Sequence, residues 1–186
     1  VPVTICFNKC DLVTEEQKAE LEAIYKPAGY EVFFTSAKAG INLDGLKELL
    51  KGKTTTVAGP SGVGKSSLIN QLQDDVYMET GSISEKIERG KHTTRHSEII
   101  PLGEDSYIMD TPGFSSMDIP GFEKEDLWTC YPEFAEYEPY CKFQGCSHIN
   151  EPSCGVKDAL AEGKISQVRY DNYVLLYNEM KQIKKY

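Results

Sequence analysis

Residues 59–66 carry the most specific chemistry in this sequence of 186 residues. They are Gly-Pro-Ser-Gly-Val-Gly-Lys-Ser and match the phosphate-loop pattern G-x-x-x-x-G-K-[ST] at every fixed position. The glycines let backbone N–H groups turn inward, and a following helix adds positive potential at its N-terminus, so the loop suits a polyphosphate. We expect Lys65 to reach the β- and γ-phosphates and the Ser66 hydroxyl to bind Mg²⁺. The predicted phosphate-binding residues are Gly59, Pro60, Ser61, Gly62, Val63, Gly64, Lys65, Ser66 and Ser67.

A second motif, at residues 8–11, is suited to recognising a guanine base. Its sequence, Asn-Lys-Cys-Asp, follows a strand-like run and matches N-K-x-D, the guanine-reading element of GTPases. A carboxylate at Asp11 can accept hydrogen bonds from N1–H and the 2-amino group of guanine, whereas adenine lacks this pair of donors. Asn8 would hold the loop and contact the purine edge, and the stem of Lys9 would cover one face of the base. A solvated loop is the alternative, and the phosphate loop in the same chain favours the nucleotide site.

Residues 36–38 form a third short motif that follows the next predicted strand. Ser36, Ala37 and Lys38 resemble the S-A-K element of GTPases, in which a backbone N–H, here near Ala37, meets guanine O6. A tripeptide has almost no specificity by itself. Its position one β-α-β unit after the N-K-x-D motif gives it weight.

Two further segments match the switch elements that sense the γ-phosphate. Residues 110–113 are Asp-Thr-Pro-Gly, the D-x-x-G pattern, so Asp110 would hold Mg²⁺ through water and the Gly113 N–H would touch the γ-phosphate. The polar run 79–96 lacks helical or strand periodicity and is the expected place for switch I. We favour Thr94 over Thr93 as its Mg²⁺-sensing residue. A surface loop without this role is the alternative.

Catalysis of hydrolysis requires a group that orients water, and the usual one is absent. Phe114 occupies the place where many GTPases carry a glutamine. His92 and His96, in the polar loop beside the threonines, are the nearest candidates, and we favour His92. Lys65 and Thr94 complete the predicted catalytic set, and solvated loop histidines remain the alternative.

The cysteines near the C-terminus have the spacing of a metal site. Cys141, Cys146, His148 and Cys154 lie within 14 residues and match a closed tetrahedral Cys₃His zinc site. The alternative is reduced cysteines that pack as small hydrophobic side chains. Six cysteines would also permit disulfides in a secreted chain. A phosphate loop implies a nucleotide and hence the cytoplasm, where disulfides are rare.

The remaining sequence predicts the elements that position these motifs. Strand-like runs at 1–7, 30–35 and 54–58 alternate with helix-like runs at 14–26, 42–51 and 66–72, and 97–109 predicts a hairpin. These elements predict an α/β, three-layer P-loop domain over residues 1–118. Residues 119–186 predict a small zinc-bound, mostly α-helical domain. It ends in a helix over 166–185, whose apolar stripe is expected to be mostly core: Val168, Tyr173, Leu176, Tyr177, Met180 and Ile183.

The charge of the chain limits the kinds of partner that it could bind. The net charge is −9 and the isoelectric point is near 4.9, which argues against a generic nucleic-acid binder. Residues 141–186 hold seven Lys/Arg and five Asp/Glu, so they carry +2 and residues 1–140 carry −11. Only the C-terminal end, which carries the net positive charge, could lie against a phosphate backbone without electrostatic repulsion. No signal peptide or membrane-span-length apolar run is visible, and the start at Val1 without Met suggests a fragment or a processed end.

The order of the motifs is that of a circularly permuted GTPase, because N-K-x-D and S-A-K precede the phosphate loop. With the C-terminal Cys₃His cluster, this order resembles the ribosome small-subunit-dependent GTPase family (RsgA, also called YjeQ or YloQ). The resemblance implies GTP/GDP, Mg²⁺ and Zn²⁺ as ligands, and the small ribosomal subunit and its rRNA as partners. It also implies an N-terminal OB-fold that this sequence lacks. We expect a monomer that does not bind membranes.

The usual GTPase sheet has one more strand than this sequence offers. That strand lies between the phosphate-loop strand and the N-K-x-D strand, and in permuted order it would precede residue 1. An open slot would leave backbone groups unpaired, so we expect an upstream segment or a separate chain to fill it. The rival functions are a nucleotide-gated RNA-binding module with incidental hydrolysis, and an ATPase or kinase, against which the N-K-x-D motif argues.

Overall fold

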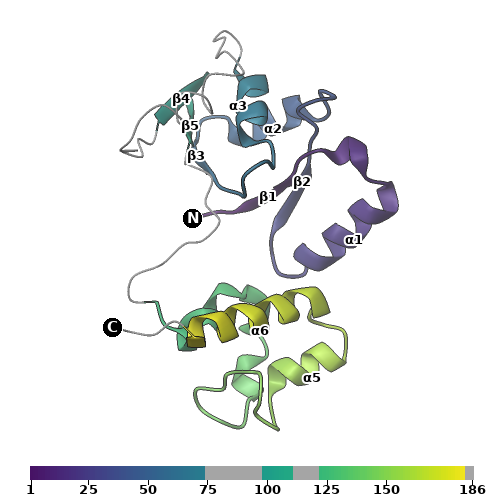
Figure 1. Cartoon of the computed structure of the whole chain (residues 1–186), viewed down its shortest axis with the longest axis vertical. Coiled ribbons are helices and arrows are strands. Elements are labelled where there is room, and N and C mark those ends of the chain that lie inside the picture. The colour runs from purple at the N-terminus through teal and green to yellow at the C-terminus, as the bar shows by residue number, and fades with distance from the viewer. Residues whose placement is uncertain (74–97, 111–121, 183–186) are drawn as a thin grey trace. The chain divides into compact units, whose positions relative to one another are not determined.

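The structure is a computed structural model of the chain and describes residues 1–73, 98–110 and 122–182 (Figure 1). The chain divides into two compact units. One unit contains Val1–Ile5, Glu15–Val32 and Asp118–Tyr186, and the other contains Cys6–Thr14 and Phe33–Met117. In the described residues, no helix has the length and apolar character needed to cross a bilayer.

The first elements form a β-α-β segment that carries both base-reading motifs. Strand β1 (Thr4–Phe7) pairs with β2 (Glu31–Phe34), and α1 (Glu15–Tyr25) connects them. The Thr4 hydroxyl donates to Glu31 at 3.2 Å, and the Phe7 and Phe34 rings stack at 5.5 Å, so the strands run in the same direction. The strand expected over 1–7 begins only at Thr4, because Pro2 has no N–H for a ladder.

The next elements form a second sheet and two helices, and the phosphate loop joins one strand of this sheet to one of the helices. Helix α2 (Leu43–Leu50) precedes β3 (Thr54–Val57), and the loop leads into α3 (Lys65–Leu72). Strands β4 (Glu98–Gly103) and β5 (Ser106–Asp110) form the predicted hairpin. Its two turn residues, Glu104 and Asp105, both have positive φ, 46° and 57°, as a two-residue turn between twisted strands requires. The order is β3-β5-β4, with β3 parallel and β4 antiparallel to β5.

The core of this second sheet comes from apolar side chains of the helices and strands around it. Ile108 on the central strand is fully buried, and Ile69 and Leu72 on α3 are 2% and 1% exposed. Leu46 and Leu50 of α2 belong to the same cluster. This packing fixes β3 and α3, the two elements that flank the phosphate loop.

The two sheets do not join within the described residues. There β1 pairs with β2, while β3 pairs with β5. The permuted GTPase order requires such a break if a strand from outside this sequence lies between β1 and β3. That additional strand remains a prediction.

The C-terminal part is built from helices, without a strand among its described residues. Its elements are the 3₁₀ helices η2 (Lys124–Cys130), η3 (Pro132–Phe134) and η4 (Glu138–Tyr140), and the α-helices α5 (Gly155–Ala161) and α6 (Gln167–Gln182). Phe134, Val156 and Tyr173 are at most 1% exposed and centre a separate hydrophobic cluster. Helix α5 was not expected from the sequence.

The stripe predicted on α6 is partly wrong. Val168 and Leu176 are 48% and 41% exposed, so they lie outside the core. The helix instead packs with Tyr170 and Val174 beside the fully buried Tyr173. Tyr177 and Met180 pack as expected, and Ile183 lies outside the described residues.

Candidate functional site

The loops that follow β1 and β2 are tied together by their backbones. Residue Lys9 adopts a left-handed conformation (φ 66°) and starts the 3₁₀ turn η1 (Cys10–Leu12), which contains Asp11. The Cys10 N–H then donates to the Thr35 carbonyl at 2.9 Å. The N-K-x-D and S-A-K motifs therefore form one continuous surface at the carboxyl ends of two parallel strands.

Asp11 is held as a carboxylate at this surface. The Ser36 hydroxyl donates to it, and with the nearby Lys38 ammonium it lowers the pKa of Asp11 below the ordinary value. Ser36 is fully buried, and its oxygen accepts from the Ala39 N–H at 3.0 Å, so the hydroxyl proton is directed toward Asp11. An ionised, acceptor-only group is what recognition of two guanine donors needs.

Asn8 links this surface to the phosphate loop. Its Oδ1 accepts from the Ala37 N–H at 3.1 Å, and its Nδ2 donates to the Val63 carbonyl at 3.1 Å. Lys9 makes a parallel link, because its Nζ donates to the Gly62 carbonyl at 2.9 Å. The N–H expected to meet guanine O6 thus already has an acceptor in Asn8, a detail that the sequence motif does not contain.

The phosphate loop has the backbone conformation that its glycines allow. Gly64 has φ 98° and caps α3, whose first internal bond runs from the Leu68 N–H to the Gly64 carbonyl at 2.9 Å. A Cβ at this position would lie closer than 3.0 Å to the Asn8 amide, so only glycine fits. Ser66 and Ser67 are exposed in the first turn of α3.

Lys65 folds over its own loop. Its Nζ donates to the Gly59 carbonyl at 2.6 Å and to the Pro60 carbonyl at 3.0 Å. A bound phosphate would compete with these two carbonyls for the ammonium. The lysine is therefore located at the loop but must move to reach the β- and γ-phosphates.

The predicted switch residues lie mostly outside the described residues. His92, Thr94, Gly113 and their neighbours Thr93, His96 and Phe114 belong to this group. The backbone of Asp110 is described, and it pairs with Val57 at the end of β5. Its position is therefore beside the strand end from which the phosphate loop starts, while its side chain is not described.

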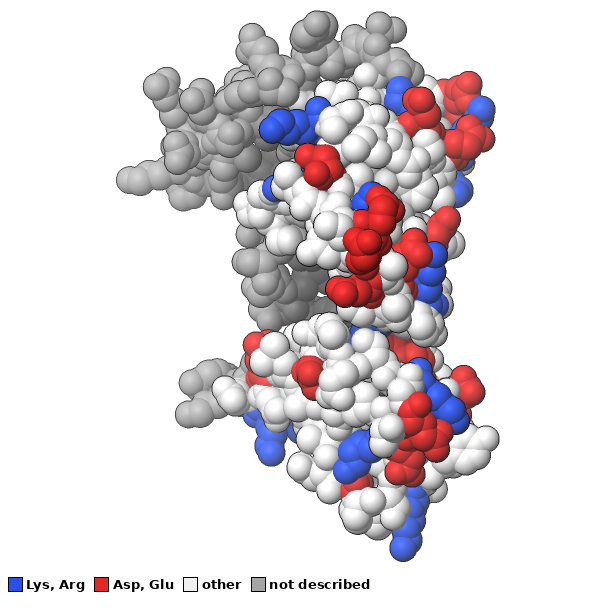
Figure 2. Space-filling view, turned by 90° about the vertical axis from the view of Figure 1, so that its right-hand side faces the viewer, with Lys and Arg blue, Asp and Glu red and all other residues white. Residues whose placement is uncertain are grey.

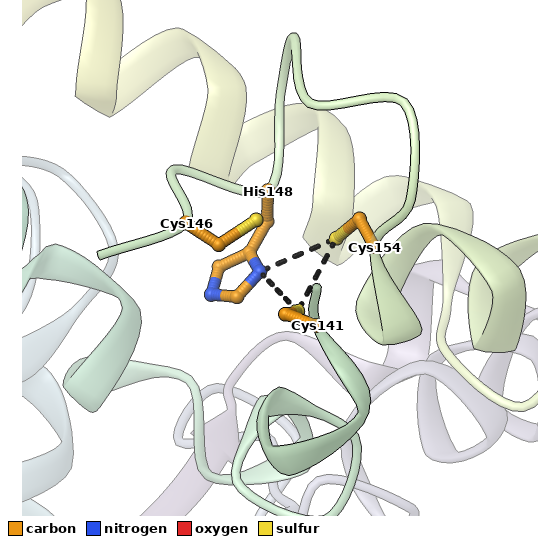
Figure 3. Close-up of side chains that lie close together, drawn as sticks. All are labelled: Cys141, Cys146, His148 and Cys154. Carbon is orange, nitrogen blue, oxygen red and sulfur yellow. Dashed lines mark hydrogen bonds between the residues drawn. The ribbon is translucent and has the colours of Figure 1, made fainter. Parts of the chain in front are cut away.

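The four predicted metal ligands come together in the C-terminal part (Figure 3). Their ligand atoms all lie within 4.8 Å of one another. The Cys141 and Cys154 sulfurs are 3.7 Å apart, and the His148 Nδ1 lies 3.6 Å from the first and 3.4 Å from the second. Cys146, His148 and Cys154 are buried and Cys141 is half-buried. Burial raises the pKa of Cys146 to about 12, so a cation would have to displace thiol protons on binding.

The loop that carries these ligands is anchored by groups that the sequence motif did not indicate. Tyr170 and Tyr173 on α6 donate to the carbonyls of His148 and Ser147 at 2.7 and 2.8 Å. Burial acts to raise the pKa of Glu151, but hydrogen bonds from the N–H and hydroxyl of Ser147 and from the Ile149 N–H lower it to about 2. His148 has φ 58°, a strained conformation for a non-glycine residue, and these anchors hold it there.

Together, the loops after β1, β2 and β3 define a P-loop fold of the GTPase class, with its motifs in circularly permuted order. Residues 1–120 match the family described as RsgA GTPase. The chain belongs to this family, as the motif order indicated.

Similar proteins cover almost all of the chain. A small ribosomal subunit biogenesis GTPase RsgA of Agathobacter rectalis is 76% identical over 186 residues, which are 100% of this chain and 62% of that protein. A protein of the same name from Clostridium perfringens is 49% identical over 180 residues, 97% of this chain and 62% of the relative. This sequence therefore spans about 62% of the length of these relatives.

Two solved structures share the fold. The crystal structure of YjeQ from Thermotoga maritima matches with a TM-score of 0.80 and 36% identity, over 98% of this chain and 61% of that one. The crystal structure of YloQ, described as a circularly permuted GTPase, matches with a TM-score of 0.72 and 36% identity, over 98% and 58%.

Proposed function

We propose that this chain binds guanine nucleotides and hydrolyses GTP to GDP and phosphate, as a switch in the maturation of the small ribosomal subunit. The observation that carries the proposal is the linkage made by Asn8, whose side chain joins the two base-reading loops to the phosphate loop. One ligand with a guanine at one end and phosphates at the other matches this arrangement. Relatives of the chain carry the name small ribosomal subunit biogenesis GTPase.

In this proposal the base and the phosphates are recognised by separate residues. Asp11 accepts from the guanine donors. Asn8 holds the loop and contacts the purine edge, and the stem of Lys9 covers one face of the base. Lys65 leaves its two carbonyl acceptors to meet the phosphates. A Mg²⁺ ion held by Ser66, Asp110 and Thr94 would neutralise phosphate charge that develops during transfer.

Hydrolysis also needs a group that orients the attacking water, and a phenylalanine at position 114 cannot do so. We assign this role to His92, with His96 as the alternative. If this histidine acts only when a partner positions it, the free chain should hydrolyse GTP slowly and the partner should greatly accelerate hydrolysis. Fast turnover by the isolated chain, or full stimulated activity in both His92→Ala and His96→Ala, would eliminate this mechanism.

We further propose that residues 1–118 form the GTPase domain and residues 119–186 a zinc-binding domain. With Zn–S bonds of about 2.3 Å and a Zn–N bond of about 2.0–2.1 Å, a regular tetrahedron has S···S edges of about 3.8 Å and S···N edges of about 3.5 Å. Three of the six corresponding distances agree with this: 3.7 Å between the Cys141 and Cys154 sulfurs, and 3.6 and 3.4 Å from these sulfurs to His148 Nδ1. The Cys146 sulfur lies within 4.8 Å of the other three ligand atoms. Three thiolates and one imidazole leave no open position, so the role is structural.

The proposed partners are those that the resemblance to the family implies, namely the small ribosomal subunit and its rRNA. We propose that the chain acts as a monomer in the cytoplasm. A further segment with the strand that lies between β1 and β3, and an OB-fold, would complete the sheet and add RNA affinity.

The decisive experiment is the GTPase rate of the chain with and without purified small ribosomal subunits. We expect slow turnover alone and strong stimulation by the subunits. Competition by GDP but not by ADP separates a GTPase from an ATPase or kinase. Comparing RNA affinity with GDP and with a non-hydrolysable GTP analogue tests the alternative of a nucleotide-gated RNA-binding module, in which hydrolysis is incidental.

A further inference from the structure

The segment 140–144, around the first cysteine of the proposed metal site, exposes aromatic side chains that the hydrophobic core does not use. Tyr140 is 77% exposed and Phe143 is 43% exposed. Lys142 and Gln144, between and beside them, are also exposed. We call these four residues, Tyr140, Lys142, Phe143 and Gln144, the aromatic tip. Scattered single apolar residues are ordinary on a surface, but two large rings within four residues are a contiguous feature.

The aromatic tip is held at both ends. Cys141 lies between Tyr140 and Lys142, Cys146 comes two residues after Gln144, and both cysteines belong to the cluster of possible metal ligands. The Lys142 N–H donates to the Ser153 carbonyl at 3.2 Å, and Gly145, with φ 68°, allows the chain to turn back toward Cys146. Rings on a fixed loop lose little conformational entropy when a ligand stacks on them.

The sequence that contains the aromatic tip is unusual for this acidic chain. No Asp or Glu occurs from residue 139 to residue 150. Lys142 makes no ion pair among those found in the described residues, and its Nζ lies 5.9 Å from the centre of the Phe143 ring. An ammonium this close to an exposed ring can meet the phosphate of a nucleotide whose base stacks on that ring.

The face shown in Figure 2 offers no broad basic surface for RNA. On the face shown in Figure 2, lysine and arginine side chains are interspersed with acidic ones and form no broad basic surface. Recognition of RNA on that face would have to rely on base stacking at a local site more than on a basic patch. Base-paired RNA buries the faces of its bases, so stacking selects unpaired nucleotides.

We propose that the aromatic tip binds single-stranded RNA, with Tyr140 and Phe143 as stacking platforms, Lys142 on a phosphate and Gln144 on a base edge. This inference deepens the proposed function, because it gives the zinc-binding domain a role toward rRNA. It rests on the proposed metal site, which closes the loop. It does not involve the residues assigned to nucleotide binding.

The test is RNA binding by the 186-residue chain purified without chelator. The probe is a fluorescein-labelled 12-nucleotide oligouridine, followed by fluorescence anisotropy at several salt concentrations. Tyr140→Ala and Phe143→Ala should each weaken binding about 5- to 150-fold, and Phe143→Trp should retain it. Lys142→Gln should make the slope of log K against log salt less negative by about 0.7. Annealing the probe to its complement should weaken binding at least about tenfold.

Leu175→Ala is the matched control, because Leu175 is an exposed apolar residue on α6 of the same unit, 56% accessible. It should bind the probe like the parent chain. The proposal is overturned if both alanine variants at the tip bind RNA normally, or if the duplex binds as well as the single strand. If those variants bind RNA normally but lose binding to small subunits, the tip contacts a protein instead. Zinc content and affinity for a fluorescent GDP are measured in every variant, so failure of the nucleotide site is seen separately.

Discussion

The Glu133–Arg169 ion pair offers a quantitative test of how the C-terminal part is stabilised. Arg169 on α6 donates to both carboxylate oxygens of Glu133 at η3, through its Nε and, at 3.1 Å, its Nη2. The side chains are only 13% and 7% exposed, and the guanidinium carbon lies 4.8 Å from the centre of the Tyr131 ring. Removing one member of such a pair leaves the other charge buried without a partner, which costs about 3–5 kcal/mol.

We therefore expect Glu133→Gln and Arg169→Met each to destabilise this part by about 3–5 kcal/mol. With a urea dependence of about 2 kcal/mol per molar, the midpoint should fall by roughly 1.5–2.5 M. Unfolding can be followed by the fluorescence of Trp128, the single tryptophan, whose ring centroid lies 6.2 Å from that of His148 in the same cluster. The double variant should be less destabilised than the sum of the two changes, because no unpaired charge remains.

The matched control is Lys124→Gln, since Lys124 pairs with Glu125 at the surface, with side chains 31% and 62% exposed. An exposed pair contributes about 0–1 kcal/mol, so the midpoint should barely move. A loss below about 1 kcal/mol in Glu133→Gln, or a double variant as destabilised as the sum, would refute the buried-pair reasoning.

Four further changes test the candidate sites. Gly64→Ala should lower guanine-nucleotide affinity in a fluorescent-GDP titration, because it adds about 1–2 kcal/mol of left-handed strain and pushes against the Asn8 amide; unchanged affinity would contradict the geometry. Asp11→Asn should weaken guanine binding and admit xanthine nucleotides, and equal ATP and GTP affinity in the parent chain would sink the assignment. His92→Ala should abolish subunit-stimulated hydrolysis while GTP affinity stays nearly constant. His148→Gln should reduce the zinc content from one ion per chain in metal analysis and lower the melting temperature of the C-terminal part, and a parent chain without zinc would count against the site.

The part of the fold that carries the phosphate loop and the N-K-x-D and S-A-K motifs could be predicted, because the sequence signals for its strands, turns and helices are local. The β-branched run that became β3 and the glycine before Lys65 require a strand, a left-handed turn and a helix in that order, and this order was found. The N-K-x-D and S-A-K motifs likewise stand at strand ends. The acceptor of the Ala37 N–H could not be predicted, because it depends on a contact with Asn8 across 29 positions of the chain.

The C-terminal part was less predictable because its elements depend on tertiary contacts. Helix α6 has apolar residues on more than one face. The helical spacing of its apolar residues therefore did not distinguish Val174, which packs against the core cluster, from Leu176, which is exposed. Helix α5 has only seven residues and begins directly after Cys154. A helix this short has little intrinsic stability, and its position is set by the cluster of ligands and by the core.

The links made by Asn8 and Lys9 also bear on how quickly a bound ligand could leave. In the described residues, the hydrogen bonds recorded between the N-K-x-D loop and the phosphate loop are the two donated by these side chains to Val63 and Gly62. At about 0.5–1.5 kcal/mol each, they oppose local separation of the loops by about 1–3 kcal/mol. In the proposed nucleotide site, release of a ligand that contacts both loops would require breaking these links as well as the ligand's own contacts.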